Sequence, residues 1–457
     1  MPRGGNAALS YLLASNAVPN PCEATSIQAE IDSLTSQISQ LRARLKKREK
    51  NLRLYRTTLS PVRRVPAEIW AEIFAFVLPQ KLFDQDEREE LMDLQLVCKT
   101  WRNAARLKHR LWSGLLIDME DVERFPPVEK IIEWLGRSAG VPRSLQVVLQ
   151  EHEDCEEKDS PCRAHNSALA ALLANGGSLH DLSLVCCDPQ CFQILVDSLK
   201  AVDGPITNRP WNSLRSLTCT FYLGWSESPD PSKSIFMSLP PNVTSFKLHL
   251  PDKYSAFPHG SDSATTPLNI PPGFLEQLTS FSLSSDWEGL KWLECTLPFC
   301  GNVEDLSLDF DFSLWEYDSN GDDVQQRLRS GFILPEVRTL SLQNVFSSSL
   351  DILSFLKTPQ LVDLDIGTGD NGEDMDCGLA ELVLKLIKRS NCEASFRCFR
   401  LRKAWLDAEQ LADTLRGLPS LTHLTLEDVV VVEPDYSDAF ELLREDAQPS
   451  LQPRPQI

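Results

Sequence analysis

Apolar residues recur every three or four positions over residues 27–59, the spacing of a coiled-coil seam. The seam is Ile27, Ile31, Leu34, Ile38, Leu41, Leu45, Leu52, Tyr55 and Leu59, with one step of seven across Arg48. Ser60-Pro61 ends it, because proline cannot continue a helix. We therefore expect a flexible N-terminus over 1–26 and a coiled-coil helix over 27–60. Self-association through the seam and folding onto the chain's own surface both fit this pattern.

The second half of this expected helix is strongly basic. Residues 42–64 hold ten lysines and arginines and one acid, Glu49, a net charge of +9. A solvated helix face explains such a run. A nuclear-import signal or a contact with an acidic surface is the alternative.

A short and very apolar helix is predicted next. Pro66 suits its first turn, where the missing N–H is not needed. Ile69 and Ile73 lie on one face, and Trp70 and Phe74 lie beside them. This apolar band is too wide for one partner surface.

A second helix is predicted from a matching pattern. It carries Leu91, Leu94, Cys98 and Trp101 at steps of three, four and three, with Val97 adjacent. Helices this short and apolar cannot bury all their surface among themselves, so we expect an interface. Packing against the domain that follows is the alternative.

The two segments together resemble the F-box. The resemblance rests on "VPAEIWAEIF", then "LQLVCKTWRNAA", then "LW", and covers about fifty residues within 61–118. Two departures stand out. Val65 replaces the commoner leucine, and the connector "VLPQKLFDQDEREELMD" is longer and more acidic than in compact members.

This resemblance implies docking onto the Skp-type adaptor of a cullin-RING ubiquitin ligase. It assigns Pro66, Ile69 and Val97 mainly to the adaptor face, and Trp101 partly to holding the helices together. The adaptor-binding residues carried over from the motif are Val65, Pro66, Ile69, Ile73, Phe74, Leu94, Val97, Cys98 and Trp101.

A motif of the form Leu-x-x-Leu-x-Leu recurs nine times in the rest of the chain, at a mean spacing of about 30 residues. Its central positions are Leu182, Leu217, Phe246, Phe281, Leu306, Leu340, Leu364, Phe399 and Leu424. "RSLQVVLQ" near Leu145 reads as one more strand, and helical patterns precede most of the motifs. We predict an α/β fold in which residues 119–432 form a leucine-rich-repeat-like solenoid with a parallel sheet, followed by a tail, 433–457. Unrelated α/β segments are the alternative.

The residues between the apolar positions of each strand should face the open side of the sheet. They change from acidic in the middle to basic near the end, which suggests a target protein whose Lys/Arg-rich segment meets the aspartates. Ordinary solvated polarity is the alternative. The predicted target-binding residues are Asp305, Asp309, Asp363, Asp365, Arg400 and Arg402.

Composition narrows the classes of function. The 457 residues are 42% apolar and 24% charged, an ordinary globular composition, and the net charge of −20 argues against nucleic acid or an anionic membrane as partner. There is no run of the ~20 apolar residues that a membrane span needs. Thirteen scattered cysteines without a signal peptide indicate a reduced cytoplasmic or nuclear protein with free thiols.

Catalytic motifs are absent from the sequence: we find no phosphate-binding loop, no HExxH and no nucleophile elbow. We expect no enzyme activity and no cofactor. His152, Cys155, Cys162 and His165 form a weak zinc candidate, since an acidic exposed loop explains them equally well. Zinc-dependent catalysis by this loop would require stoichiometric metal. The cysteines of "CCDPQC" read as buried thiols at a strand end.

The sequence therefore predicts a substrate-recognition subunit of a Skp–cullin–F-box type ubiquitin ligase. The alternative is a scaffold in which the coiled coil oligomerises the chain and the repeats bind partners, with no ligase role. The two hypotheses differ in what they predict for Pro66, Ile69 and Val97. A ligase subunit requires these residues to be accessible, whereas a scaffold would have them buried.

Overall fold

The computed structural model describes the chain in ten stretches, and the predicted tail, 433–457, lies outside them. The described residues are 5–15, 18–119, 126–149, 162–202, 209–225, 230–257, 263–310, 330–346, 348–368 and 378–432. The chain divides into two compact units, one of Met1–Phe74 with Gln95–Leu107 and the other of Ala75–Leu94 with Lys108–Ile457. The predicted helical segment 61–118 is therefore shared between the two units.

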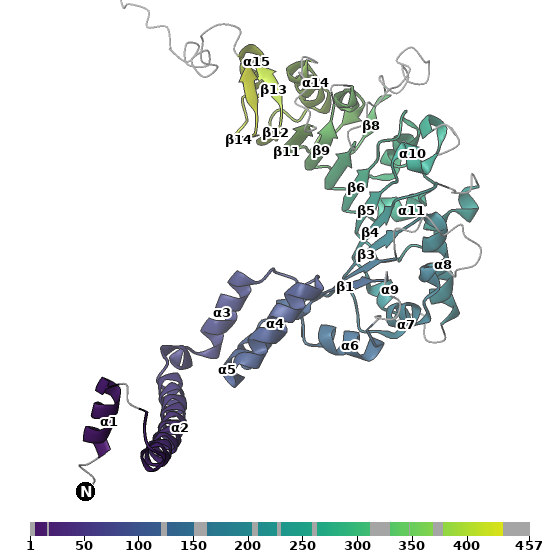
Figure 1. Cartoon of the computed structure of the whole chain (residues 1–457). Coiled ribbons are helices and arrows are strands. Elements are labelled where there is room, and N and C mark those ends of the chain that lie inside the picture. The colour runs from purple at the N-terminus through teal and green to yellow at the C-terminus, as the bar shows by residue number, and fades with distance from the viewer. Residues whose placement is uncertain are drawn as a thin grey trace, which may run out of the picture. The chain divides into compact units, whose positions relative to one another are not determined.

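Helices make up the N-terminal part of the chain (Figure 1). They are α1 (Gly5–Ser15), α2 (Pro21–Thr58), η1 (Pro61–Arg64), α3 (Ala67–Val77), α4 (Gln85–Val97), α5 (Lys99–Leu107) and η2 (His109–Trp112), where η denotes a 3₁₀ helix. The long helix and its end before Pro61 agree with the heptad pattern.

The prediction of a flexible segment over 1–26 is wrong for residues 5–15 and 21–26, which are helical. Asn20 explains the early start of α2. Its side chain accepts a hydrogen bond from the Glu23 N–H (2.8 Å), and its own N–H donates to the Glu23 carboxylate (2.9 Å). Such a capping box, with Pro21 in the first turn, satisfies main-chain groups that a helix start leaves unpaired.

The second predicted helix is two helices. Cys98 separates α4 from α5, and its carbonyl oxygen accepts the N–H of Arg102 (3.0 Å) to start a new turn. The three-and-four spacing from Leu91 to Trp101 therefore continues across a break, and spacing alone does not reveal that break.

The second unit is built on eleven parallel strands that follow one another in sequence order. They are β1 (Gly114–Asp118), β2 (Ser144–Val148), β3 (Asp181–Cys186), β4 (Ser216–Phe221), β5 (Ser245–His249), β6 (Ser280–Ser284), β7 (Asp305–Asp309), β9 (Thr339–Val345), β11 (Asp363–Thr368), β12 (Cys398–Arg402) and β14 (His423–Glu427). Two small parallel sheets pair β8 (Phe332–Ile333) with β10 (Leu356–Lys357), and β13 (Trp405–Asp407) with β15 (Val430–Val432). The α/β class is confirmed.

Each of the nine predicted central positions lies in a strand of the large sheet, and neighbouring ones pair in register. Leu364, for example, lies between Leu340 and Phe399. Leu145 pairs with Leu182, so the additional strand near Leu145 is also present. Strand β1 was not predicted from the sequence, because its five residues lie within the segment 61–118 that was predicted to be helical.

Helices follow the outer side of this sheet, which curves so that its other face is uncovered (Figure 1). The longer ones are α6 (Val128–Gly136), α7 (Ser167–Asn175), α8 (Pro189–Ala201), α14 (Leu379–Ser390) and α15 (Ala408–Arg416), each at a predicted position. A helical pattern also precedes the motif at Leu364, but the structure has the 3₁₀ turn η10 (Ser349–Ser354) there, because β10 begins at Leu356. Shorter turns are η4 (Arg163–His165), α9 (Pro210–Ser213), η6 (Pro231–Lys233), η7 (Ile235–Ser238), α10 (Lys253–Ala256), η8 (Ser263–Thr265), α11 (Pro272–Glu276), α12 (Lys291–Glu294) and η9 (Leu297–Phe299).

The core lies between the sheet and these outer helices. Along β3, β4 and β12 buried and half-buried residues alternate, as the period of two predicts. Aromatic side chains such as Phe281, Trp287 and Trp292 are completely buried there. Burial also raises the pKa of the Cys300 thiol to about 12, which keeps it protonated at neutral pH. No helix among the described residues combines the length and apolar character needed to cross a bilayer.

The part of the long connector that precedes α4, residues 78–84, covers the first edge of the large sheet. Leu82 is completely buried, and the Phe83 carbonyl oxygen accepts the Leu116 N–H of β1 (3.1 Å). Gly114 permits this close approach, since a Cβ there would lie 2.9 Å from the Lys81 Cβ. An uncovered edge strand is a site for unwanted pairing, so the long connector has a structural role in this chain.

Lys81 anchors the connector to the following strands. Its ammonium group donates to the Ser144 hydroxyl (2.6 Å) and to the Asp181 carboxylate (3.1 Å). Burial alone would raise the pKa of Asp181, but hydrogen bonds from Ser144, His180 and Lys81 outweigh it and leave the pKa below its ordinary value. A depressed pKa means that the ionised carboxylate stabilises the folded state.

We expect Asp181→Asn to lower the free energy of unfolding of the second unit by about 1 kcal/mol at pH 7. Because the folded pKa is depressed, this contribution is complete above the unfolded pKa of about 3.9 and is lost as pH falls through the folded value. Urea titrations at pH 7 and below pH 4 measure it. Asp197→Asn, which removes an exposed pair with Lys200, is the control with little effect. An equal loss at both pH values would contradict the argument.

Candidate functional site

The first unit exposes aliphatic side chains on one face of α3. Ile69 is 51% exposed, and Pro66 and Ile73, three residues before and four after it, are also exposed. Phe74 points the other way and is only 2% exposed. The wide apolar band therefore has one face buried within the protein and one face open to solvent.

Three aromatic rings hold α3 and α5 together. The ring centroids of Trp70 and Trp101 are 4.5 Å apart, and those of Phe74 and Trp101 are 5.3 Å apart. The indole N–H groups of both tryptophans are buried and find no acceptor among the described residues. The cluster fixes the backbone that carries the exposed face, as expected for Trp101.

The junction of α4 and α5 adds a second set of exposed apolar side chains. Val97 is 60% exposed and Leu96 is 73% exposed, and the Cys98 side chain is also open to solvent. Leu96 was not predicted. Its signal was present as an apolar residue directly before Val97 in the helix "QDEREELMDLQLV".

The nine residues carried over from the motif thus separate into three groups. Pro66, Ile69, Ile73, Val97 and Cys98 are exposed, whereas Val65, Leu94 and Trp101 are half-buried. Phe74 was predicted as an adaptor contact and is instead a core residue. Further along α3, Phe76 is exposed and was missed.

The exposed aliphatic side chains of this set are suited to association. Aliphatic groups supply binding energy by leaving water, and clusters of this kind on a small helical unit mark protein interfaces. Among the described residues no group of three or more His, Cys, Asp or Glu side chains is arranged to hold a metal ion.

The open face of the large sheet carries the predicted target-binding residues. Asp305 is exposed on β7, and Asp309 accepts a hydrogen bond from the Asn344 amide (2.9 Å). Thr339 lies between Asp305 and Asp363 in the strand register. The acids of β7 and β11 therefore border one short stretch of β9.

Three of the six predicted residues bind one another. Asp365, with only 9% of its side chain exposed, accepts from Arg400 (3.1 Å) and from Arg402 at both oxygens (3.1 and 2.7 Å). Arg402 also donates to the Gln343 side chain (3.0 Å), and the bond to Asp365 raises the pKa of Arg400. Adjacent strands place the opposite charges of β11 and β12 side by side, where they bind one another.

Asp363 differs from its neighbour Asp365. One of its carboxylate oxygens is buried and receives no hydrogen bond from any described residue. Burial raises the pKa of Asp363, with the Arg400 charge opposing that rise and the Asp365 charge adding to it.

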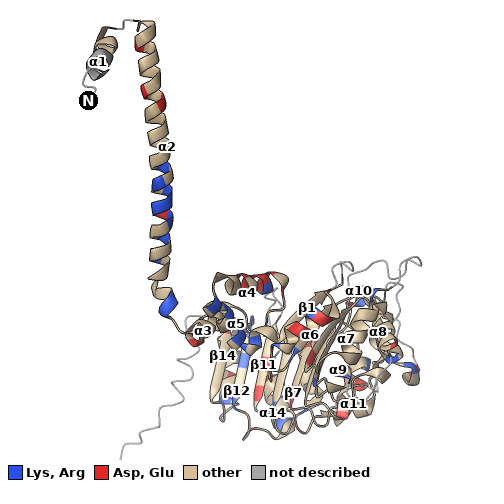
Figure 2. Cartoon of the chain, turned by 90° about the horizontal axis from the view of Figure 1, so that it is seen from below, with Lys and Arg blue, Asp and Glu red and all other residues tan. Residues whose placement is uncertain are grey.

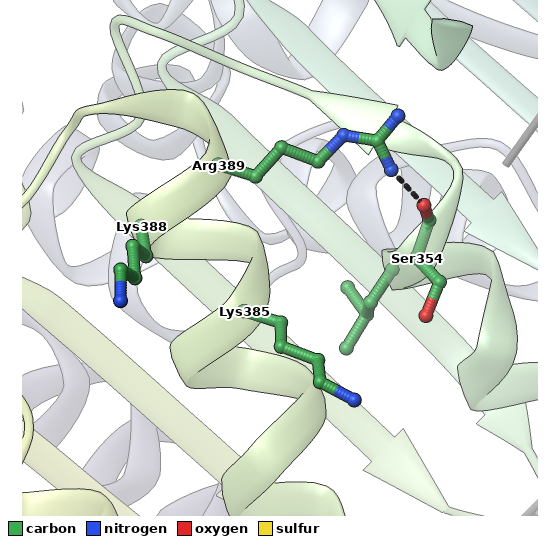
Figure 3. A pocket seen from close by; sticks show the side chains of 5 residues that line it. Ser354, Lys385, Lys388 and Arg389 are labelled. Atoms are coloured by element: carbon green, nitrogen blue, oxygen red, sulfur yellow. Dashed lines mark hydrogen bonds between the residues drawn. The ribbon is translucent and has the colours of Figure 1, made fainter. Parts of the chain in front are cut away.

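A pocket of about 390 Å³ lies between η10 and α14, lined by Leu353, Ser354, Lys385, Lys388 and Arg389. Figure 3 shows Arg389 turned to the Ser354 carbonyl oxygen, to which it donates a hydrogen bond. Lys385 pairs with Glu381 at 2.6 Å. Two of the three cations therefore bind the protein itself, and basic residues in a last helical turn also stabilise the helix end.

The zinc candidate is described in part. His152 and Cys155 lie outside the described residues. The Cys162 sulfur lies 3.4 Å from that of Cys191, while His165 contacts the Ser198 hydroxyl at 3.2 Å. The described half of the candidate thus has other neighbours. Cys186, Cys187 and Cys191 are buried where β3 ends and α8 begins, as predicted.

No protein-family model and no curated protein matches this chain. Function is therefore inferred from the residues and from the two surfaces, one on the helical unit and one on the sheet.

Proposed function

We propose that this chain is the substrate-recognition subunit of a Skp–cullin–F-box type ubiquitin ligase. The observation that supports it is the exposure of Pro66, Ile69 and Val97, the residues that the F-box resemblance assigns to the adaptor face. The scaffold alternative required these side chains to be buried.

The docking surface has the properties that adaptor binding needs. Its aliphatic groups come from α3 and from the α4–α5 junction, and the Trp70–Phe74–Trp101 cluster holds the supporting backbone. A preorganised surface loses little conformational entropy on binding. Ubiquitin transfer would take place on a partner enzyme, and this chain would contribute proximity between the target lysine and the loaded enzyme.

In this proposal the second unit is a leucine-rich-repeat-like solenoid that binds the target on its open face. Asp305 is exposed and Asp363 is half-buried, so a lysine or arginine of the target fits beside Thr339. Asp365, Arg400 and Arg402 would instead keep the face rigid through their mutual bonds.

Co-purification with the Skp adaptor tests the proposal. We expect the wild-type chain to form a stable complex and Pro66→Ala/Val97→Asp to weaken it at least about tenfold, because a charge would be desolvated at the centre of an aliphatic contact. Circular dichroism establishes that the variant is folded. Lys247→Asp, on the open face of the sheet, is the matched control that leaves adaptor binding unchanged.

Absence of a complex with the wild-type chain would contradict the ligase proposal and favour the scaffold. Equal binding by the wild type and the double variant would place the adaptor contact elsewhere.

A further inference from the structure

The long helix α2 presents an apolar seam that none of the described residues covers. No described residue of α2 is buried, and Ile38 and Leu45, at the middle of the seam, are 48% and 59% exposed. The seam from Ile27 to Leu59 extends over about 48 Å at 1.5 Å per residue. Helix propensity alone stabilises such an element weakly, and packing of its apolar stripe supplies most helical stability.

Among the described residues that precede α2, helix α1 is too short to cover the seam. Helix α1 has 11 residues, or about 16 Å, a third of the seam's length. Its own Tyr11 and Leu13 are exposed, so it is not packed onto α2 through them. A partner of equal length is required.

We infer that this partner is a second copy of the chain, joined to the first in a parallel two-stranded coiled coil through α2. In heptad terms Ile31 and Ile38 occupy a positions, and Leu34 and Leu41 occupy d positions. Isoleucine at a with leucine at d, as in this half of the seam, favours two parallel strands over trimers or tetramers; further along, Leu45 and Leu52 occupy the a positions.

The flanking charges agree with the parallel orientation. It places Arg44, at a g position, next to Glu49 of the other copy at the following e position, and the pair forms twice by symmetry. A fully overlapping antiparallel pair would instead put Arg42 against Arg42 and Arg44 against Arg44. Like charges in these positions are destabilising.

Arg48 is the one charged residue on the seam, at a d position. In the parallel pair the two Arg48 side chains meet, which weakens the dimer and fixes its register, since a single polar core layer disfavours other alignments. Figure 2 shows that basic side chains gather in the C-terminal half of α2, whereas acids lie toward its start. Repulsion between the basic halves is screened by salt, so the dimer is expected to tighten as salt is added.

Light scattering of the full-length chain at micromolar concentration tests the inference. The expected mass is twice the 51.4 kDa of one chain. Ile38→Asp/Leu41→Asp should return it to a single chain, while Ser36→Asp/Ala43→Asp, at f positions on the opposite face, should remain dimeric. A wild-type monomer, or an equal response of both variants, would overturn the inference.

Cysteine cross-linking decides the orientation. In a Cys22→Ser/Cys98→Ser background, Leu34→Cys should form a disulfide between copies when a mild oxidant is added, because d positions of parallel strands face each other. The f-position variant Ser36→Cys should not. A fully overlapping antiparallel pair would place Leu34 opposite Leu52, so a dimer without the Leu34→Cys cross-link would overturn the parallel arrangement.

The inference does not depend on the adaptor proposal. A dimer that fails to bind the Skp adaptor would contradict the adaptor proposal and leave the dimer inference intact. A monomer that binds the adaptor would contradict the dimer inference and leave the adaptor proposal intact.

Discussion

Replacing Trp101 with alanine is expected to loosen the contact between α3 and α5 by about 3 kcal/mol. The indole lies 4.5 Å from the Trp70 ring and 5.3 Å from the Phe74 ring, so alanine removes both aromatic contacts and leaves a cavity. Hydrogen exchange of the α3 and α5 amides measures this loss of local stability. Amides that exchange through local opening of the two helices should exchange about 100-fold faster in the variant.

Two variants of the same helix provide the comparison. Trp101→Phe keeps an aromatic ring at this position and should lower the local stability of α3 and α5 less than Trp101→Ala does. Leu107→Ala, an exposed residue of α5, should change exchange little. Unchanged protection of α3 in Trp101→Ala would show that the aromatic cluster does not hold the two helices together.

Replacing Leu364 with alanine is expected to lower the free energy of unfolding of the second unit by about 3–4 kcal/mol. Leu364 is completely buried in β11, between Leu340 of β9 and Phe399 of β12. Truncation removes apolar contacts and leaves a void that the neighbouring strands cannot fill. The midpoint of urea unfolding of this unit, followed by a probe of its own strands, should fall accordingly.

Ser307→Ala is the matched control on the open face of β7, in the same cross-strand row as Ser341 and Asp365. We expect a change within about 0.5 kcal/mol there. Similar losses for Leu364→Ala and Ser307→Ala would mean that the leucines and the serines do not face opposite sides of the sheet.

Local patterns were sufficient to predict most of this fold. The repeated motif identified nine strands and, because each repeat contributes one strand, also their in-register pairing. The early start of α2 was missed, although Asn20, Pro21 and Glu23 are the residues that cap it. The role of the connector could not be predicted from local sequence patterns, because Lys81 contacts Ser144 and Asp181, which are 63 and 100 positions away.

The candidate sites were predicted less completely. The alternation of side chains along a strand correctly placed Asp365, Arg400 and Arg402 on the open face. Their pairing with one another depends on the register of β11 and β12, which the alternation does not give. On α3 the wide apolar band did not reveal which side is buried. The position of Trp101 decides this, because it packs against Phe74 and leaves Ile69 in solvent.

We propose that the exposed aliphatic face of the helical unit contacts the Skp adaptor directly. A photo-cross-linking residue at Leu96, next to Val97, tests it most directly when purified chain and adaptor are mixed and irradiated, with Lys247 on β5 as the control position. We predict a covalent product with the adaptor from position 96 and none from position 247. No product from position 96, or equal products from both, would contradict the account.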